Sequence, residues 1–184
     1  MLSSLLDVVF PKICISCNRE EETHLCGDCL AIISINAATL PELFWATSYQ
    51  EPLVRNAISS FKYPPFLKDL ALPLASLIIA HLALLDKPQN FTGTVLCPIP
   101  LHKRKLKWRG FNQAQEIAKH LSQALSIPLY SDILLKTKNT TPQIELQGIE
   151  RRINMLDVLK SNAQNLCKIK TSSWWTMCIQ PEQQ

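Results

Sequence analysis

Residues 14–29 read CISCNREEETHLCGDC, and this stretch holds four of the chain's seven cysteines as two CxxC pairs separated by eight residues. Each pair brings two sulfur atoms to one side of a tight turn, and two pairs can enclose a zinc ion in a tetrahedral thiolate shell. So short a segment has little apolar surface, so the metal would supply its folding energy. The spacing predicts a zinc ribbon with ligands Cys14, Cys17, Cys26 and Cys29. Two disulfides or a redox CxxC are the alternatives.

The predicted ribbon is structural rather than catalytic, because four thiolates leave no open coordination position. His24 lies between the two pairs and is expected on the surface.

The N-terminal residues have no basic region and no small-residue cleavage site, and Asp7 interrupts their apolar run, so they are a poor signal peptide. Cysteines in a chain without an export signal indicate a reducing compartment. The sequence therefore predicts a cytoplasmic protein.

The composition is that of a globular protein. The chain has 184 residues, of which 47% are hydrophobic and 18% charged, enough for one domain and a small appendage. Disordered and collagen-like chains are excluded. Four glycines against twelve prolines argue against a glycine-rich dinucleotide-binding fold. The longest apolar run, 70–85, is broken by Pro73 and His81 and is too short to span a membrane, so it predicts a buried helix.

Periodicity after the ribbon predicts alternating helices and strands. We expect strands at 44–49 and 94–100, a strand region at 127–135, and helices at 52–61, at 67–85 and from Asn112 onward.

Charge is uneven along the chain: residues 1–100 carry 6 basic and 9 acidic groups, and residues 101–160 carry 11 and 5. Residues 101–112 form a basic loop between a strand and a helix, an arrangement suited to phosphate. A solvated loop, or one that binds nucleic-acid backbone without specificity, is the alternative.

These motifs together resemble the ComF family, competence-associated proteins with a zinc ribbon ahead of a type I phosphoribosyltransferase-like domain. The resemblance rests on the double CxxC, on PIPLH at 98–102, on RGFNQA at 109–114 and on TPQ at 141–143 with the residues that follow it. It covers residues 1 to about 160 in the family's order. It implies an α/β fold with a zinc ribbon at 1–40 and a parallel-sheet domain, here incomplete, at 41–160.

The resemblance also implies site residues. Pyrophosphate of phosphoribosyl pyrophosphate (PRPP) would be held, with magnesium, by the loop after the first core strand, at His102, Arg104, Arg109, Gly110, Asn112 and Gln113. A flexible loop would close over PRPP, at Thr141, Gln143, Arg151, Arg152 and Asn154. Such enzymes work by positioning and charge neutralisation more than by a covalent nucleophile.

The C-terminal tail, residues 161–184, departs from the family pattern V-D-D-V-x-T-T-G, whose carboxylates hold ribose hydroxyls and whose turn holds the 5′-phosphate. Trp and Met have single codons, so the DNA under residues 174–178 is largely fixed. When the reading frame is moved by two bases, the codons of residues 174–178 must encode Val-Asp-x-Val. In that frame, the codons that follow, up to residue 184, are compatible with Tyr-Thr-Thr-Gly-Ala-Thr. We expect a frameshift between about residues 159 and 170, which makes this tail aberrant and the domain truncated.

Three functional hypotheses follow. The first is a ComF-like protein of DNA uptake that lacks transferase activity as translated. The second is a binding module that joins single-stranded DNA or a competence helicase through the ribbon and the basic loop. The third is the remnant of a broken gene.

Overall fold

The computed structural model describes residues 11–37, 44–85, 91–139, 158–161 and 173–177, the last segment by its backbone alone. The chain divides into two compact units, Met1–Gln89 and Asn90–Gln184. The expected boundary near residue 40 falls at residues 38–43, outside the described part of the chain.

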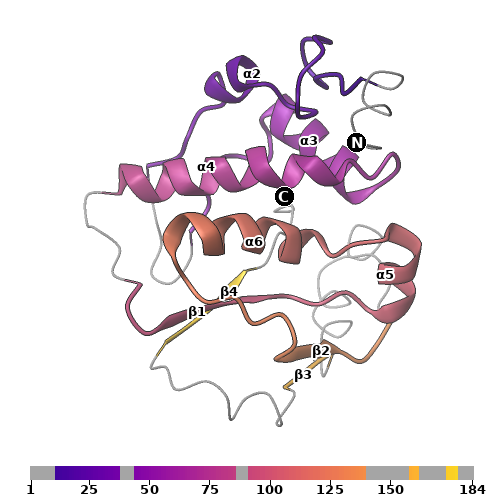
Figure 1. Ribbon diagram of the computed structural model, residues 1–184, viewed down its shortest axis with the longest axis vertical. Helices are drawn as coiled ribbons and strands as arrows, with labels where there is room; N and C mark the ends of the chain where they lie inside the picture. The colour runs from indigo at the N-terminus through magenta and orange to yellow at the C-terminus, as the bar shows by residue number, and fades with distance from the viewer. Residues whose placement is uncertain (1–10, 38–43, 86–90, 140–157, 162–172, 178–184) are drawn as a thin grey trace, which may run out of the picture. The chain divides into compact units, whose positions relative to one another are not determined.

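The first unit begins with the cysteine-rich segment. Ile13 and Glu20 form an antiparallel bridge on either side of the first CxxC pair, and the short helix α2 (Gly27–Ala31) follows Cys26 (Figure 1). Three helical elements follow along the chain: α3 (Pro52–Lys62), a single 3-10 turn η1 (Lys68–Leu70) and α4 (Ala71–Leu84).

Helix α3 begins with Pro52, whose missing N–H costs nothing in a first turn. It buries Val54, Ala57 and Phe61, which recur at helical spacing. Helix α4 tolerates Pro73 for the same reason, since this residue also lies in the first turn. Both expected helices are confirmed. None of the described helices is long and apolar enough to cross a membrane.

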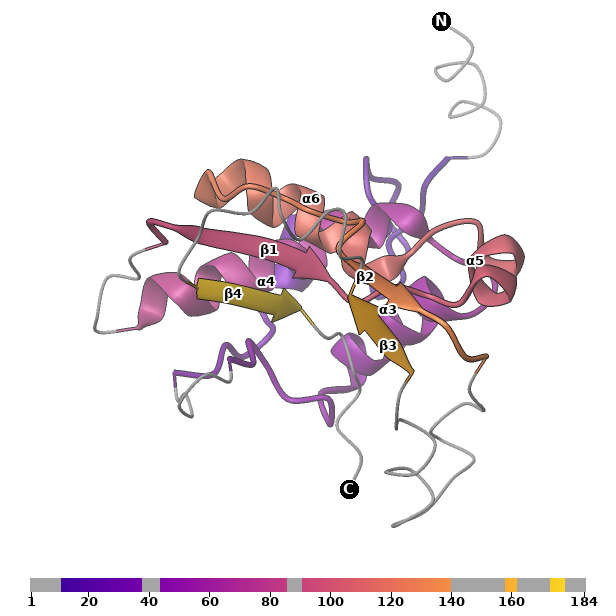
Figure 2. The same cartoon turned by 90° about the horizontal axis from the view of Figure 1, so that it is seen from below.

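The second unit is built on the buried strand β1 (Thr94–Pro98), which is followed by α5 (Lys103–Arg109) and α6 (Gln113–Leu125). Strand β4 (Ser173–Met177) runs parallel to β1, with Leu96 opposite Trp175 (Figure 2). Strands β2 (Leu134–Lys136) and β3 (Leu159–Ser161) form a separate antiparallel pair. Helix α6 packs against β1 through a buried face that includes Ile117, Ala118 and Leu121. The architecture is therefore mixed helix and strand.

Three expectations about individual elements need correction. Residues 44–49 form no strand: the Asn36 N–H donates to the Ala46 carbonyl at 2.8 Å, but no ladder continues from this bond in the described residues. Residues 103–109 of the expected loop are helix α5, because Lys, Arg and Leu favour helix and His102 caps it. The expected strand region at 127–135 is reduced to Leu134 onward, plus a parallel bridge between Leu129 and Leu96.

The tail contains an element that the sequence analysis did not identify. Residues 173–177 form β4, although their sequence has no alternation of apolar and polar residues that would predict a strand. Parallel pairing needs only backbone groups in register, so a strand can form without such a pattern.

Helix α4 offers a test of where the core of the first unit lies. Leu74 is 7% exposed and Leu72 is 46% exposed, although they are two residues apart. Leu74→Ala is expected to lower the free energy of unfolding by about 2–4 kcal/mol, because it opens a cavity. Leu72→Ala is the matched control and should cost about 1 kcal/mol or less. Urea denaturation of both variants measures the difference, and equal losses would contradict this placement of the core.

Candidate metal centre and strand–helix junction

The two CxxC pairs converge on one point. The Sγ atoms of Cys14, Cys17, Cys26 and Cys29 all lie within 4.8 Å of one another. The distance between the Cys17 and Cys26 sulfurs is 3.7 Å. Four sulfurs at about 2.3 Å from a tetrahedral zinc are about 3.8 Å apart, so the observed spacing fits a metal ion. This cluster could hold a metal, as the sequence predicts.

Backbone groups support the sulfurs. The Cys26 N–H points at the Cys14 sulfur and the Cys29 N–H at the Cys26 sulfur, each at 3.4 Å. The second contact arises because Cys26 caps helix α2, so a free N–H of the first helical turn faces the side chain. Such hydrogen bonds orient thiolate ligands and partly neutralise them.

Arg19 supplies positive charge next to the cluster. Its Nε donates to the Cys17 sulfur at 3.4 Å, and its Nη2 lies 3.9 Å from the Cys26 sulfur. The same nitrogen pairs with the Asp28 carboxylate at 2.6 Å, which fixes the guanidinium in place. A zinc ion with four thiolates carries net negative charge, so a fixed cation beside it is favourable. Sequence reasoning did not single out Arg19, although its position two residues after a ligand was a visible signal.

The thiols differ in how readily they ionise. The hydrogen bond from the Arg19 side chain lowers the pKa of Cys17 to about 6. The Cys29 N–H favours the thiolate of Cys26, but burial and the neighbouring cysteine side chains outweigh it and raise the pKa of Cys26 to about 12. Without a bound cation the four sulfurs therefore cannot all be ionised at neutral pH.

The cluster is tied to the helical part of the first unit. His24 Nδ1 lies 2.7 Å from both carboxylate oxygens of Asp69, which belongs to η1. The Asn56 amide of α3 donates to the Ile15 carbonyl at 3.4 Å. His24 is half-buried and outside the ligand cluster, so it connects the ribbon to η1. Its partner lies 45 residues away in the chain, a pairing that spacing alone could not reveal.

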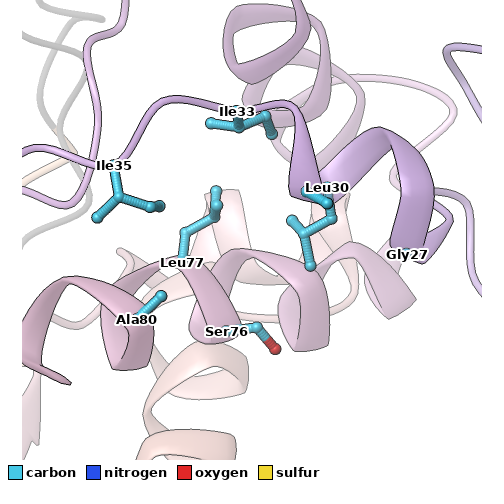
Figure 3. Close-up of a pocket in the computed structure, with 8 residues that line it drawn as sticks. Gly27, Leu30, Ile33, Ile35, Ser76, Leu77 and Ala80 are labelled. Carbon is cyan, nitrogen blue, oxygen red and sulfur yellow. The ribbon is translucent and has the colours of Figure 1, made fainter. Parts of the chain in front are cut away.

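An apolar groove of about 300 Å³ lies beside α2, on the surface of α4 (Figure 3). Leu30, Ile33 and Leu77 line it, and the one lining hydroxyl, on Ser76, donates to the Leu72 carbonyl at 3.1 Å. The groove therefore contains no charged group that could bind an anion or catalyse a reaction.

In the second unit, Asn112 joins the end of β1 to the start of α6. Its side-chain oxygen accepts from the Ala114 N–H at 3.2 Å and caps the helix. Its amide nitrogen donates to the Ile99 carbonyl at 3.0 Å. Asn can make both contacts because it carries a donor and an acceptor on one amide. The helix N-terminus is therefore held directly beside the residue that follows the strand.

The other residues expected to contact pyrophosphate lie around this junction. His102 caps α5 through its ring nitrogen, and Gly110 ends α5 with φ +85°, a conformation that favours glycine. Arg109 is buried and donates to the Gln113 side chain. Arg104 is exposed. All six residues lie in the short segment from the end of β1 to the first residue of α6.

Five other expected site residues belong to the segment of the chain between β2 and β3. Thr141, Gln143, Arg151, Arg152 and Asn154 lie outside the described residues. The segment that contains them is bounded by β2 and β3, which pair antiparallel, with Leu135 opposite Lys160. Its two ends are therefore brought close together.

Comparisons with protein-family models, with curated proteins and with solved structures find no match.

Metal removal tests the centre. The purified chain is expected to bind one equivalent of zinc, and a chelator should unfold the ribbon, because the metal supplies its folding energy. Cys14→Ser should weaken zinc binding by about 100-fold or more, since it removes a buried ligand. Cys97→Ala, in β1, is the control and should leave the stoichiometry unchanged. Metal analysis and competition with a chromogenic chelator measure both, and full zinc retention by Cys14→Ser would contradict the assignment.

Asn112 tests the junction. Asn112→Ala is expected to lower the free energy of unfolding by about 1–2 kcal/mol, because it removes a helix cap and a hydrogen bond. Asn112→Asp keeps the capping oxygen but loses the donor to Ile99, so its loss should be smaller. Equilibrium denaturation of the two variants compares them. If Asn112→Ala matched the native chain, the junction would not depend on this side chain.

Proposed function

We propose that this chain is a ComF-type protein in which a structural zinc ribbon precedes a phosphoribosyltransferase-type domain, and that it lacks transferase activity as translated. One observation carries the proposal: Asn112 fixes the N-terminus of α6 beside Ile99, directly after the buried strand β1. A strand that leads through a basic segment to a helix N-terminus is the arrangement that binds phosphate groups in α/β folds.

The charge around the junction supports an anionic ligand. Five of the seven residues of α5 are Lys or Arg. The first turn of α6 adds backbone N–H groups and the positive end of its dipole. Buried Arg109 is held by Gln113 from that same turn, so one guanidinium is fixed at the junction. A pyrophosphate group with magnesium is an anionic ligand whose charge these groups would complement.

The antiparallel pair β2–β3 supports the expected loop that would close over PRPP. It closes the base of a long segment, residues 137–158, and the Thr137 N–H donates to the Val158 carbonyl at 2.9 Å. A hairpin-like base under a long insertion is typical of a loop that closes over a ligand. The expected flexible loop falls within this segment.

In the register of β4, the reading-frame hypothesis would bring the acidic pair of the family motif next to β1. Trp175, Thr176 and Met177 lie opposite Leu96, Cys97 and Pro98. Read in the other frame, the codons of these residues encode the acidic pair of the family motif. A chain with that frame restored would therefore carry its two carboxylates alongside the last residues of β1. These β1 residues directly precede Ile99 and the junction in the chain. The chain as translated has no carboxylate in β4, so it has nothing to hold the ribose hydroxyls there.

A specific observation favours a second candidate function, the binding of single-stranded nucleic acid. Helix α5 exposes Lys103, Arg104 and Lys107, and Trp108 beside them is 58% exposed. Cations that follow a phosphate backbone, together with an exposed aromatic ring that stacks on bases, are the usual means of binding single strands. This function needs neither the acidic pair nor PRPP.

Sequencing of the coding DNA tests the frame. The codons of Thr176 and Pro181 can end in any base, but only a final G in each yields the second Asp and the Gly of the motif in the other frame. We expect G at both positions. Another base at either position would contradict an intact motif in that frame.

Binding then distinguishes the two functions. With the frame restored, calorimetry should detect magnesium-dependent PRPP binding that is at least about 10-fold tighter than that of the chain as translated. The restored chain with both motif aspartates changed to asparagine is the control and should lose this gain. If neither chain bound PRPP while both bound single-stranded DNA with an affinity that falls steeply with salt, the second function would replace the first.

A further inference from the structure

The four cysteines of the metal centre differ sharply in exposure. Cys14, Cys26 and Cys29 are 0%, 3% and 7% exposed, whereas Cys17 lies at the surface. The first CxxC pair therefore places one sulfur inside and the other where a dissolved molecule can reach it.

A second sulfur lies within reach of the exposed one. The Cys17 and Cys26 sulfurs are 3.7 Å apart, and they belong to different CxxC pairs. Arg19 donates to the Cys17 sulfur at 3.4 Å and lies 3.9 Å from the Cys26 sulfur, so its guanidinium borders both. Its partner Asp28 is itself exposed. An incoming peroxide oxygen that gains negative charge would meet this cation at the open side of the cluster.

We propose that Cys17 is a site of oxidation by hydroperoxides, and that it is resolved by Cys26 to form a disulfide across the two CxxC pairs. This inference rests on the metal centre and is independent of the proposed phosphoribosyltransferase ancestry. A cysteine that is accessible, beside a fixed cation and next to a resolving partner is the kind that oxidises selectively.

The reaction balances in two steps. A lone pair of the Cys17 thiolate attacks the peroxide, the O–O bond breaks, an alcohol or water leaves, and Cys17 becomes a sulfenic acid. The Cys26 thiolate then attacks the Cys17 sulfur, the S–S bond forms, and the sulfenic oxygen leaves as water after protonation. In total, two thiolates are oxidised by two electrons, one hydroperoxide is reduced and two protons are consumed.

The consequence is loss of the metal. A disulfide between Cys17 and Cys26 removes one ligand from each pair and leaves only Cys14 and Cys29. Two thiolates are too few for the four-coordinate site that a structural zinc requires, so the ion is released and the ribbon loses its folding energy. A thiol reductant and zinc would restore it. The ribbon thereby becomes a reversible sensor of peroxide.

The experiment uses the full zinc-loaded chain with Cys167 and Cys178, which lie outside the described residues, changed to serine. Hydrogen peroxide is added in slight excess, zinc release is followed with a chromogenic chelator, and disulfides are mapped by mass spectrometry under non-reducing conditions. We expect about one zinc released per Cys17–Cys26 disulfide. A dimedone adduct should appear at Cys17 before the disulfide forms. A predominant disulfide within either CxxC pair, or first labelling at another cysteine, would overturn the proposal.

A matched pair of variants separates exposure from metal binding. Cys17→His keeps a ligand set of three cysteines and one histidine, which zinc accepts, but removes the exposed sulfur. It should release zinc at least about 10-fold more slowly in peroxide. Cys29→His keeps Cys17 and should release zinc about as fast as the native set. Equal rates in the two variants would overturn the proposal, and if either failed to bind zinc, the labelling order in the parent chain would decide.

Discussion

Four sulfur atoms within 4.8 Å of one another can be held as thiolates only if positive charge lies among them. This constraint governs the first third of the chain. It explains why backbone N–H groups point at the sulfurs, why Arg19 lies over the open side, and why so short a segment with so little apolar surface can have a defined conformation. A metal ion bound by the four sulfurs would add folding energy to the small buried core of this segment, which includes Leu25 and Ile33.

The second unit depends on a different kind of constraint. Strand β1 is buried along its length, so the chain that leaves it must enter its next helix without exposing unpaired backbone groups to the interior. Asn112 satisfies groups on both sides of that transition, and Gly110 provides the left-handed residue that ends α5 just before it. The cations of α5 are arranged around a junction that local hydrogen bonds make rigid.

Features with local causes could be predicted from the sequence. The CxxC spacing predicted the cysteine cluster, and helical periodicity predicted α3 and α6, because both signals lie within a few residues of the structure they specify. The strand expected at 44–49 does not form, although its aromatic and β-branched residues favour one. A strand forms only when a neighbouring strand pairs with it, and the sequence of the segment alone does not specify that neighbour.

The same argument applies to the site. Asn112 and Gly110 were named through the family resemblance, and their capping roles in the structure depend only on residues next to them in the chain. The contact of His24 with Asp69 could not be predicted, since the pair is separated by 45 residues and forms only when η1 folds against the ribbon. Helix α5 was missed for another reason: a run of like charges appears solvated and irregular, but the intrinsic helix propensity of Lys and Arg, with a cap at each end, outweighs their repulsion.

The contact between His24 and Asp69 has a thermodynamic consequence. Together with the Asn56 amide on the Ile15 carbonyl, it links the ribbon to η1 and α3, so unfolding of the ribbon would break contacts that both of them make. Free energy gained when a metal binds the sulfurs is then distributed into helices that touch no metal. The stability of α3 and η1 against unfolding would then rise with the concentration of free metal around the protein.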